Sequence, residues 1–554
     1  MALTAQPQTT ADSTPHGGAY RPPAIGTGGV VASAHGLASL AGLRCLIDGG
    51  NAVDAAVAVA AALSVVEPFM SGPGGGGGYM MFYEAKSGRL HGLNYLGHTP
   101  RAAHAGLWSD QEEVHDDPRS AIVPGALAGW LAALERFGSM DRATVFRGAI
   151  EQAEHGWPIL PWNVRIFEEN APRIEPFATS RRVLYPNGRP PRAGELVPQP
   201  DLARSYREIV EGGADAFYRG QLGERFVRGV QEAGGLLSIE DLADLKVEWQ
   251  EPLGVDYRGL RVSTLPPECS GVQYLESLKI LEAYDLPALG HNSAEYLHLL
   301  IETIKLASAD RSRYTMEGRA AVEPLLGERY AAERRALIDR SRAAPSEGER
   351  YLRDKKGAVE PGDPLRYRRD NTTHFEVVDR DHNIVSITQS NGAGWGCGLI
   401  AGDTGMAVNN FLYWQDLNPD SPNHLRPGFK GEMPMAPCIV THDGRPILGI
   451  GTPGSYGILQ TTLQMLLNYL DFRMNVQAAI EAPRVRAFEG TLVDVEGRVS
   501  PRVRAGLAER GHSFNLLEDW TWRVGGGHGV AVDPETGVLT GGADPRRNGA
   551  ALGW

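Results

Sequence analysis

The chain has 554 residues, with 54 Lys and Arg against 67 Asp and Glu, so its formal net charge at pH 7 is −13. This acidic balance, without a basic stripe, argues against a surface that follows nucleic-acid phosphates. The longest apolar run, residues 55–66, is too short to span a bilayer. We therefore expect a soluble protein that has neither nucleic-acid nor membrane partners.

The N-terminal segment and the cysteines indicate where the protein works. Residues 1–21 are polar and lack the basic start and apolar run of a secretory signal. Four cysteines are widely separated and show no paired spacing, which is typical of reduced, packed thiols. We expect a disordered tail over residues 1–25 and a cytoplasmic location.

The first part of the chain alternates short strands and helices. A strand is expected at residues 30–32 and a helix at 35–48, and Asn51 is a suitable N-cap for an apolar, buried helix that ends near Glu67. Five glycines at 74–78 then precede a strand at 80–83. Because the run lacks the Lys-Ser/Thr end of a P-loop and does not open a helix, we interpret it as structural and not as a nucleotide site.

The remaining pattern mixes both element types. Helices are expected at 126–137, 221–233, 272–284 and 455–472, and strands at 257–262, 406–408, 439–441 and 447–450. Residues 343–370 are rich in charge, Pro and Gly, which predicts an exposed linker. Periodicity alone indicates a protein of α and β elements.

A hairpin pattern follows the linker, with apolar alternation on both sides of a polar turn at residues 379–383. Thr372 and Thr373 open it. Two threonines ordinarily just begin a strand. If the bond between Asn371 and Thr372 is cut, however, Thr372 carries a hydroxyl nucleophile and a free α-amine that can act as its base.

The stretch 371–388 resembles the segment at which γ-glutamyltranspeptidase-family proenzymes cleave themselves. The likeness continues through residues 51–56, 66–68, 74–78, 402–405, 409–410 and 543–546. The resemblance implies an α+β fold, the four-layer αββα sandwich of N-terminal nucleophile hydrolases. It also implies a large chain, residues 26–371, and a small catalytic chain, residues 372–554, that form a heterodimer, with a dimer of heterodimers as a further option.

The resemblance also assigns the chemistry. Thr372 Oγ attacks a carbonyl, its α-amine moves the proton, and an acyl-enzyme forms; in the precursor the same hydroxyl attacks the Asn371 carbonyl. Ser390 aligns with a threonine that hydrogen-bonds the nucleophile, although a strand-end serine often bonds nearby backbone instead. Gly454 and Ser455 stand where the family has two glycines whose N–H groups bind the oxyanion. No metal or other cofactor is expected, and no metal-ligand spacing stands out among the fifteen His.

The positions that hold a γ-glutamyl group in the family differ here. Leu96 replaces an arginine, Met433 and Pro434 replace paired serines, and Phe411 and Trp414 replace a glutamine and an aspartate. An amino-acid head group needs charged partners, so a standard γ-glutamyl substrate is disfavoured. The expected substrate-binding residues are Leu96, Asn391, Trp395, Phe411, Trp414, Met433 and Pro434. A shifted alignment would instead bring polar contacts from His98, Asn391, Arg426 or Lys430.

The predicted function is a self-processing N-terminal threonine hydrolase that cleaves an amide or related acyl bond of a small non-γ-glutamyl substrate. Three alternatives remain. One is a hydrolase of a carbon–carbon bond in an α-oxo-acid intermediate of alkylproline antibiotic biosynthesis, and another is a standard γ-glutamyl hydrolase or transpeptidase. The third is an inactive binding or scaffold homologue.

Overall fold

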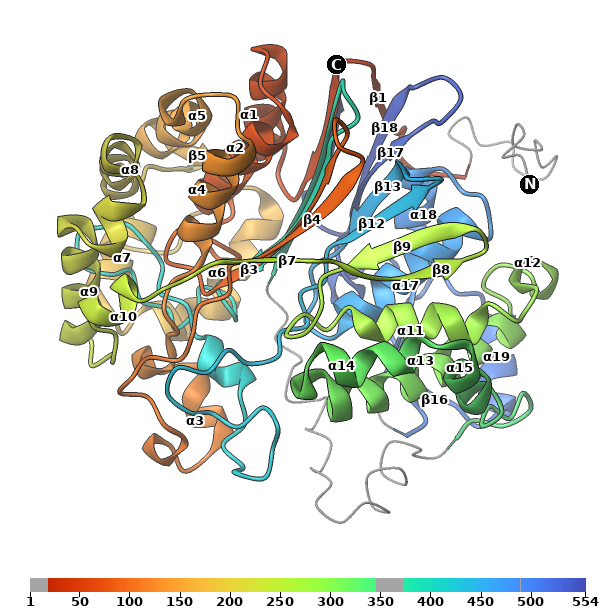
Figure 1. Cartoon of the computed structure of the whole chain (residues 1–554). Coiled ribbons are helices and arrows are strands. Elements are labelled where there is room, and N and C mark those ends of the chain that lie inside the picture. Colours follow the sequence, from red (N-terminus) through yellow and green to blue (C-terminus); the bar gives the residue numbers. More distant parts are fainter. Residues whose placement is uncertain (1–17, 345–371, 489) are drawn as a thin grey trace.

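The computed structural model describes residues 18–344, 372–488 and 490–554 (Figure 1). Two antiparallel, seven-stranded sheets form its centre. Sheet 1 has the order β19 (Ala550–Gly553), β2 (Gly29–Ser33), β10 (Thr373–Asp379), β11 (Ile384–Ser390), β3 (Gly77–Glu84), β4 (Arg89–Asn94) and β7 (Glu248–Gln250). Sheet 2 has the order β1 (Ala24–Gly26), β18 (Leu539–Ala543), β17 (His528–Val532), β13 (Arg445–Gly451), β12 (Cys438–His442), β9 (Leu260–Thr264) and β8 (Leu253–Tyr257).

Helices cover the outer face of each sheet, on the left and right of Figure 1. The helices on the side of sheet 1 include α1 (Gly36–Ile47), α2 (Ala52–Val66), α4 (Ala126–Phe137), α5 (Arg142–His155), α6 (Pro161–Ile174), α8 (Pro200–Tyr218) and α9 (Gln221–Glu232). Those on the side of sheet 2 include α11 (Val272–Leu281), α13 (Ala294–Tyr314), α15 (Glu328–Arg335), α17 (Gly457–Leu470), α18 (Val476–Glu481) and α19 (Pro501–Glu509). The protein is therefore an α+β, four-layer αββα sandwich, as the resemblance implies.

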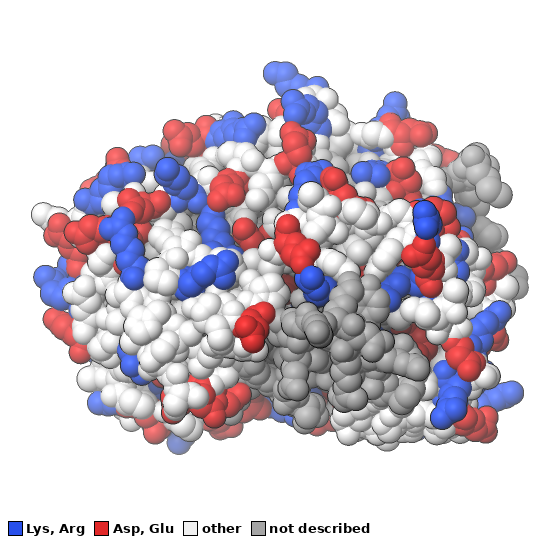
Figure 2. All heavy atoms as spheres, turned by 60° about the horizontal axis from the view of Figure 1, so that its bottom comes forward, with Lys and Arg blue, Asp and Glu red and all other residues white. Residues whose placement is uncertain are grey.

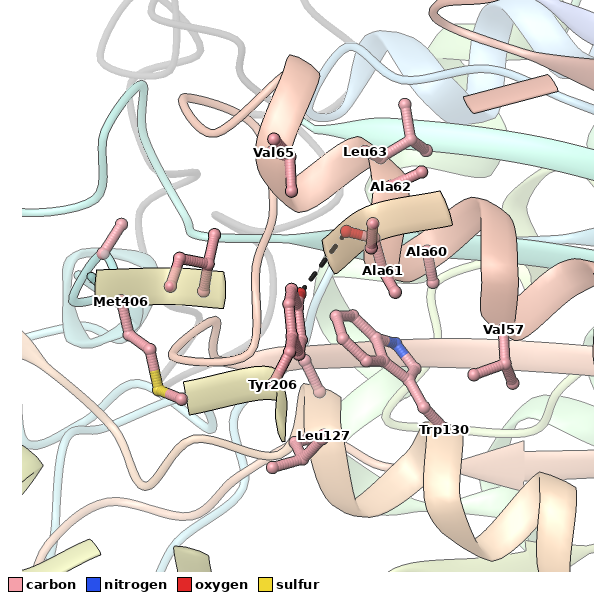
Figure 3. Packing of buried hydrophobic residues seen from close by; sticks show 14 of the residues in the cluster. Val57, Ala60, Ala61, Ala62, Leu63, Val65, Leu127, Trp130, Tyr206 and Met406 are labelled. Atoms are coloured by element: carbon pink, nitrogen blue, oxygen red, sulfur yellow. Dashed lines mark hydrogen bonds between the residues drawn. The ribbon is translucent and has the colours of Figure 1, made fainter. Parts of the chain in front are cut away.

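Helix α2 shows how the sequence produces the helical layer that covers sheet 1. Asn51 and Asp54 form a reciprocal capping box at its N-terminus, and all of its residues are buried. Its neighbours are α1 and α5 as well as β10 and β11 of sheet 1. Figure 3 shows the small side chains of α2 meeting larger ones, including Trp130, and Tyr206 donates a hydrogen bond to the Ala61 carbonyl at 3.4 Å.

Strands β10 and β11 are buried along their whole length because helix α2 covers one face and sheet 2 covers the other. This placement puts the hairpin predicted after the linker in the middle of the sandwich. On the outside, Figure 2 shows Lys and Arg intermixed with Asp and Glu over the visible face. None of the described helices has the length and apolar character needed to cross a membrane.

Three local predictions need correction. The strand expected at 257–262 is two strands, because Arg258 (φ 51°) and Gly259 (φ 83°) form a hairpin turn between β8 and β9. Residues 406–408 make only an isolated bridge, Ile400 with Ala407, in a glycine-rich loop. Ala24 and Ile25, predicted to belong to a disordered tail, instead lie in β1 (Ala24–Gly26), which pairs with β18. Most of the predicted linker and Asn371 lie outside the described residues.

Candidate active site

Thr372 immediately precedes the central strand β10 and is 4% exposed. Thr373 pairs with Gln389, so the same register brings Thr372 opposite Ser390, the last residue of β11. Ser390 pairs in turn with Gly77 at the start of β3. The glycine run, the proposed nucleophile and Ser390 therefore meet at one end of sheet 1.

Successive residues of β10 face opposite layers. Thr373 Oγ1 donates a hydrogen bond of 2.9 Å to Glu67 Oε2 at the C-terminus of α2, so Thr373 faces the helical layer. His374 faces sheet 2, since a Cβ added to Gly451 of β13 would lie 2.5 Å from its ring. Strand alternation then turns Thr372 toward sheet 2 and leaves Thr373 in a structural position.

Arg547 holds the main chain of Thr372. Its Nη1 donates to the Thr372 carbonyl at 3.2 Å, and the side chain is buried. The guanidinium carbon lies 6.0 Å and 5.8 Å from the ring centroids of Trp162 and Trp522, respectively. Arg547 was not among the site residues predicted from the sequence, although it stands directly after the family-like run 543–546.

A buried ionic network orients the segment that leads to Arg547. Asp544 accepts from Arg484 Nη1 at 2.9 Å and from the Gly527 N–H at 2.9 Å, while Arg546 pairs with Glu496 at 2.7 Å. The Arg546 and Arg484 charges outweigh burial and hold the pKa of Asp544 well below its usual value. The network fixes the Gly-rich loop 525–527, which turns tightly into β17.

The predicted oxyanion turn lies between β13 and α17. Gly454 has φ +134° and Ser455 has φ +56°, and Ser455 is 1% exposed. The Gly526 N–H donates to Thr452 Oγ1 at 2.9 Å. Gly526 also packs against Arg547, whose Cδ would lie 2.6 Å from a Cβ added there. These contacts connect the turn to the Arg547 side chain that holds Thr372.

Ser390 makes the backbone contact that was the alternative to its catalytic role. Its Oγ accepts from the Gly392 N–H at 2.8 Å. Beneath Thr372, His374 hydrogen-bonds Thr388 Oγ1 at 2.9 Å and Glu376 Oε1 at 2.8 Å. Burial raises the pKa of Glu376 well above its usual value and lowers that of His374, so burial favours the uncharged form of each group.

Glu67 is a second residue whose role the sequence did not reveal. Burial raises its pKa to about 7, and the Arg547 charge and the Thr373 hydrogen bond oppose that rise. The acid therefore titrates near neutral pH beside the strand that carries Thr372. Residues 66–68 had signalled only family likeness.

Leu96, Asn391 and Phe411 gather around the glycine run. A Cβ on Gly76 would lie 2.4 Å from the Phe411 ring, and one on Gly77 would lie 2.8 Å from Leu96 Cα. Asn391 Nδ2 donates to the Pro68 carbonyl at 3.0 Å. Close approach by these neighbours explains why the run consists of glycine, in agreement with its structural interpretation.

The other predicted substrate-binding residues divide between two cores. Trp414 lies edge-to-face with Tyr456 at 5.9 Å, and the Met433 N–H donates to the Glu268 carbonyl at 3.2 Å, with buried Pro434 directly after it. Trp395 packs elsewhere, with ring centroids 5.7 Å from Phe69 and 5.0 Å from Phe167. Trp395 belongs to the core between sheet 1 and its helices. A second core, which lies between the two sheets and between sheet 2 and its helices, contains Leu96, Phe411, Trp414 and Met433.

The polar residues considered as alternatives are engaged or exposed. Lys430 Nζ pairs with Glu248 at 2.7 Å, and the exposed Arg426 stacks on Phe429 at 3.6 Å. Burial lowers the pKa of His98. None of these contacts brings a charged partner to Leu96 or Phe411.

Within the described residues, one group has metal-ligand character. His298, Glu302 and His512 place one ligand atom each within 4.8 Å of one another. These three side chains already bind other protein groups: His298 Nδ1 and His512 Nε2 share a hydrogen bond of 2.8 Å, and Glu302 pairs with Lys305 at 2.6 Å. The Lys305 ammonium would also repel a cation. The separation of these residues along the chain hid the group from the sequence analysis.

The comparisons with known proteins decide the family. The model of the gamma-glutamyltranspeptidase family matches residues 38–554. The chain belongs to this family. A relative from Pseudomonas sp. (strain SE83), named acylase ACY 1 proenzyme, is 36% identical, with 96% of this chain and 94% of that protein covered. The glutathione hydrolase proenzyme of Bacillus subtilis (strain 168) is 33% identical, with 96% and 93% covered.

Solved structures of similar proteins agree. A cephalosporin acylase from Bacillus halodurans has a TM-score of 0.87 at 31% identity and covers 99% of both chains. The Helicobacter pylori gamma-glutamyltranspeptidase has a TM-score of 0.53 at 32% identity, with 55% of this chain and 90% of that chain covered. The protein is thus an N-terminal nucleophile hydrolase that acts on amide bonds. Both relatives are named as proenzymes.

Proposed function

We propose that the chain cleaves itself between Asn371 and Thr372 and then hydrolyses the amide bond of a small acyl compound through an acyl-enzyme on Thr372. One observation carries the proposal: Thr372 stands at the end of a central strand, opposite Ser390, with its carbonyl held by the buried Arg547. A nucleophile whose main chain is fixed in this way loses little freedom when it attacks.

The proposed reaction uses the two functional groups of mature Thr372. The Oγ–H adds to the substrate carbonyl, its proton passes to the α-amine, and the carbonyl electron pair moves onto oxygen as the oxyanion. The Gly454 and Ser455 N–H groups stabilise that charge at the N-terminus of α17. Collapse expels the amine, which takes the proton, and water then hydrolyses the ester and regenerates Thr372.

We further propose a substrate whose acyl group lacks an amino-acid head group. Leu96, Phe411 and Met433 are at most 1% exposed and apolar. A zwitterionic γ-glutamyl group would leave its charges uncompensated against such side chains. The acylase name of the Pseudomonas relative and the cephalosporin acylase structure support an N-acyl substrate for this chain as well.

The test compares wild-type protein with Thr372→Ala and Thr372→Ser by denaturing gel and intact mass. Wild type should give fragments 1–371 and 372–554, Thr372→Ser should cleave more slowly, and Thr372→Ala should stay whole. Equal cleavage of Thr372→Ala would disprove the proposed site. A full-length wild-type species would favour the scaffold alternative.

Processed protein is then incubated separately with glutaryl-, phenylacetyl- and γ-glutamyl-p-nitroanilide and with an α-oxo acid, and each reaction is quenched. An acyl adduct on the 372–554 fragment from the first two compounds is the expected result. Preference for the γ-glutamyl compound would instead favour the alternative of a standard γ-glutamyl hydrolase or transpeptidase. Turnover of the α-oxo acid alone would identify a carbon–carbon hydrolase.

A further inference from the structure

Ser455 has a backbone conformation that suits glycine. Its φ of +56° lies in the left-handed region, which a residue with a Cβ enters only at a cost in free energy. The family resemblance places a glycine at this position, and glycine would remove that cost. Ser455 therefore adopts a backbone conformation that is unfavourable for a residue with a side chain.

The Ser455 hydroxyl adds a second cost. Ser455 is 1% exposed, and its Oγ has no hydrogen-bond partner among the described residues. Buried hydroxyls in folded proteins are normally paired, and an orphaned one invites a functional explanation. A serine just ahead of a helix commonly caps it, but here the side chain makes no such bond.

The surroundings prevent the turn from relaxing to satisfy this hydroxyl. The Ser455 carbonyl accepts from the Ile458 N–H at 2.9 Å. The next residue, Tyr456, contacts the Arg311 guanidinium, 4.2 Å from its ring centroid, and the Trp414 ring, whose centroid is 5.9 Å away. Arg311 is itself buried and paired with Glu432. These contacts hold the Ser455 carbonyl and the neighbouring Tyr456 side chain in place.

The same turn opens α17, a helix of 14 residues whose N-terminus favours negative charge. We propose that the Ser455 hydroxyl is a third oxyanion donor, in addition to the Gly454 and Ser455 N–H groups. It remains unpaired in the resting protein because its partner, the substrate oxyanion, exists only during the reaction. This inference rests on the proposed function of Thr372.

The hydroxyl takes no part in proton transfer. As Thr372 Oγ bonds to the carbonyl carbon, the π electron pair moves to the carbonyl oxygen and the Thr372 proton moves to its α-amine. Ser455 Oγ–H only donates a hydrogen bond to that oxygen and keeps its proton when the carbonyl re-forms. Since the Oγ and the backbone N of Ser455 are both substituents close to one Cα, they can reach the same oxygen.

Two substitutions separate the hydroxyl from the backbone. Ser455→Ala removes the hydroxyl and keeps the strained Cβ, whereas Ser455→Gly removes the hydroxyl and relieves the strain; both keep the N–H. We expect both variants to lower kcat by about 10²-fold with little change in KM, measured with the N-acyl p-nitroanilide that wild type cleaves fastest. Ser455→Gly should also have a higher Tm than wild type, and Ser455→Ala should not.

Asp443→Gly is the matched control, because Asp443 also has a positive φ of 49° but lies exposed in the β12–β13 turn. It should keep the wild-type kcat. A kcat for Ser455→Gly equal to or above that of wild type would overturn the proposal, because the hydroxyl would then only strain the fold.

Rates are normalised to the amount of cleaved 372–554 fragment, and precursor cleavage is a second readout. Slower cleavage in both Ser455 variants would support the donor role, since cleavage also passes through an oxyanion. Failure of the proposed function itself would look different: wild type would then give no acyl adduct on Thr372.

Discussion

Arg547 Nη1 donates a hydrogen bond to the Thr372 carbonyl across 175 residues of sequence, at 3.2 Å in a buried environment. In the proposed mature enzyme this contact would anchor the new N-terminal residue. The bond joins a buried, charged side chain to the main chain of Thr372.

Arg547→Met should slow precursor cleavage and lower kcat by about 10- to 100-fold, because a hydrogen bond from a charged donor contributes about 1.5–3 kcal/mol. Densitometry of fragment formation over time measures the first effect. Arg329→Met, in which a side chain 95% exposed is changed, is the control and should behave as wild type. Normal cleavage in Arg547→Met would show that the contact is not needed.

Glu67→Gln should change how stability depends on pH. The pKa of Glu67 is raised from 4.5 to about 7 in the folded protein, so the folded state holds a proton that the unfolded state releases earlier. Its contribution is complete below pH 4.5 and is lost as the pH rises through 7. Between pH 4.5 and pH 7, the free energy of unfolding of wild type should therefore fall by up to about 3 kcal/mol relative to that of Glu67→Gln.

The measurement is denaturant unfolding of both proteins at pH 5 and pH 8, with the exposed Glu232→Gln as a control. Relative to wild type, Glu67→Gln should have a higher free energy of unfolding at pH 8 than it has at pH 5. Parallel pH profiles for the two proteins would mean that Glu67 titrates as an ordinary acid.

Gly451→Ala should disturb both the packing of the sheets and the turn that follows. The added Cβ would lie 2.5 Å from Cε1 and 2.7 Å from Nε2 of His374, whose ring is fully buried. Overpacking of this kind costs about 1–3 kcal/mol, visible as a lower Tm, and activity should fall because Thr452 to Ser455 follow directly. Gly36→Ala, where the nearest atom is 3.7 Å away, should be tolerated. A wild-type Tm in Gly451→Ala would contradict the close approach.

Trp414→Ala should weaken turnover more than Trp414→Phe does. Trp414 supports Tyr456 through an edge-to-face contact at 5.9 Å, and phenylalanine retains an aromatic ring there. We expect about a tenfold lower kcat/KM for phenylacetyl-p-nitroanilide in Trp414→Ala, since aromatic contact and packing together contribute about 1.4 kcal/mol. Identical kinetics in both variants would show that the aromatic ring at position 414 does not contribute to turnover of the substrate.

Local patterns predicted much of the fold. The N-cap at Asn51, the helix at 126–137 and the hairpin now seen as β10 and β11 each depend on residues a few positions apart, so periodicity and turn chemistry were sufficient. The same method failed at Gly259, where a two-residue turn divides what looked like one strand. The four-layer arrangement came from family resemblance, since periodicity does not encode which sheets face each other.

The site shows the same division. Sequence alone placed a threonine at the start of a strand and a helix over residues 455–472, because those features are local. Only the tertiary structure brought Arg547 to the Thr372 carbonyl, Glu67 to Thr373, and Trp395 into a different core from Phe411. These contacts depend on the order and register of strands far apart in the chain, which residue spacing does not specify.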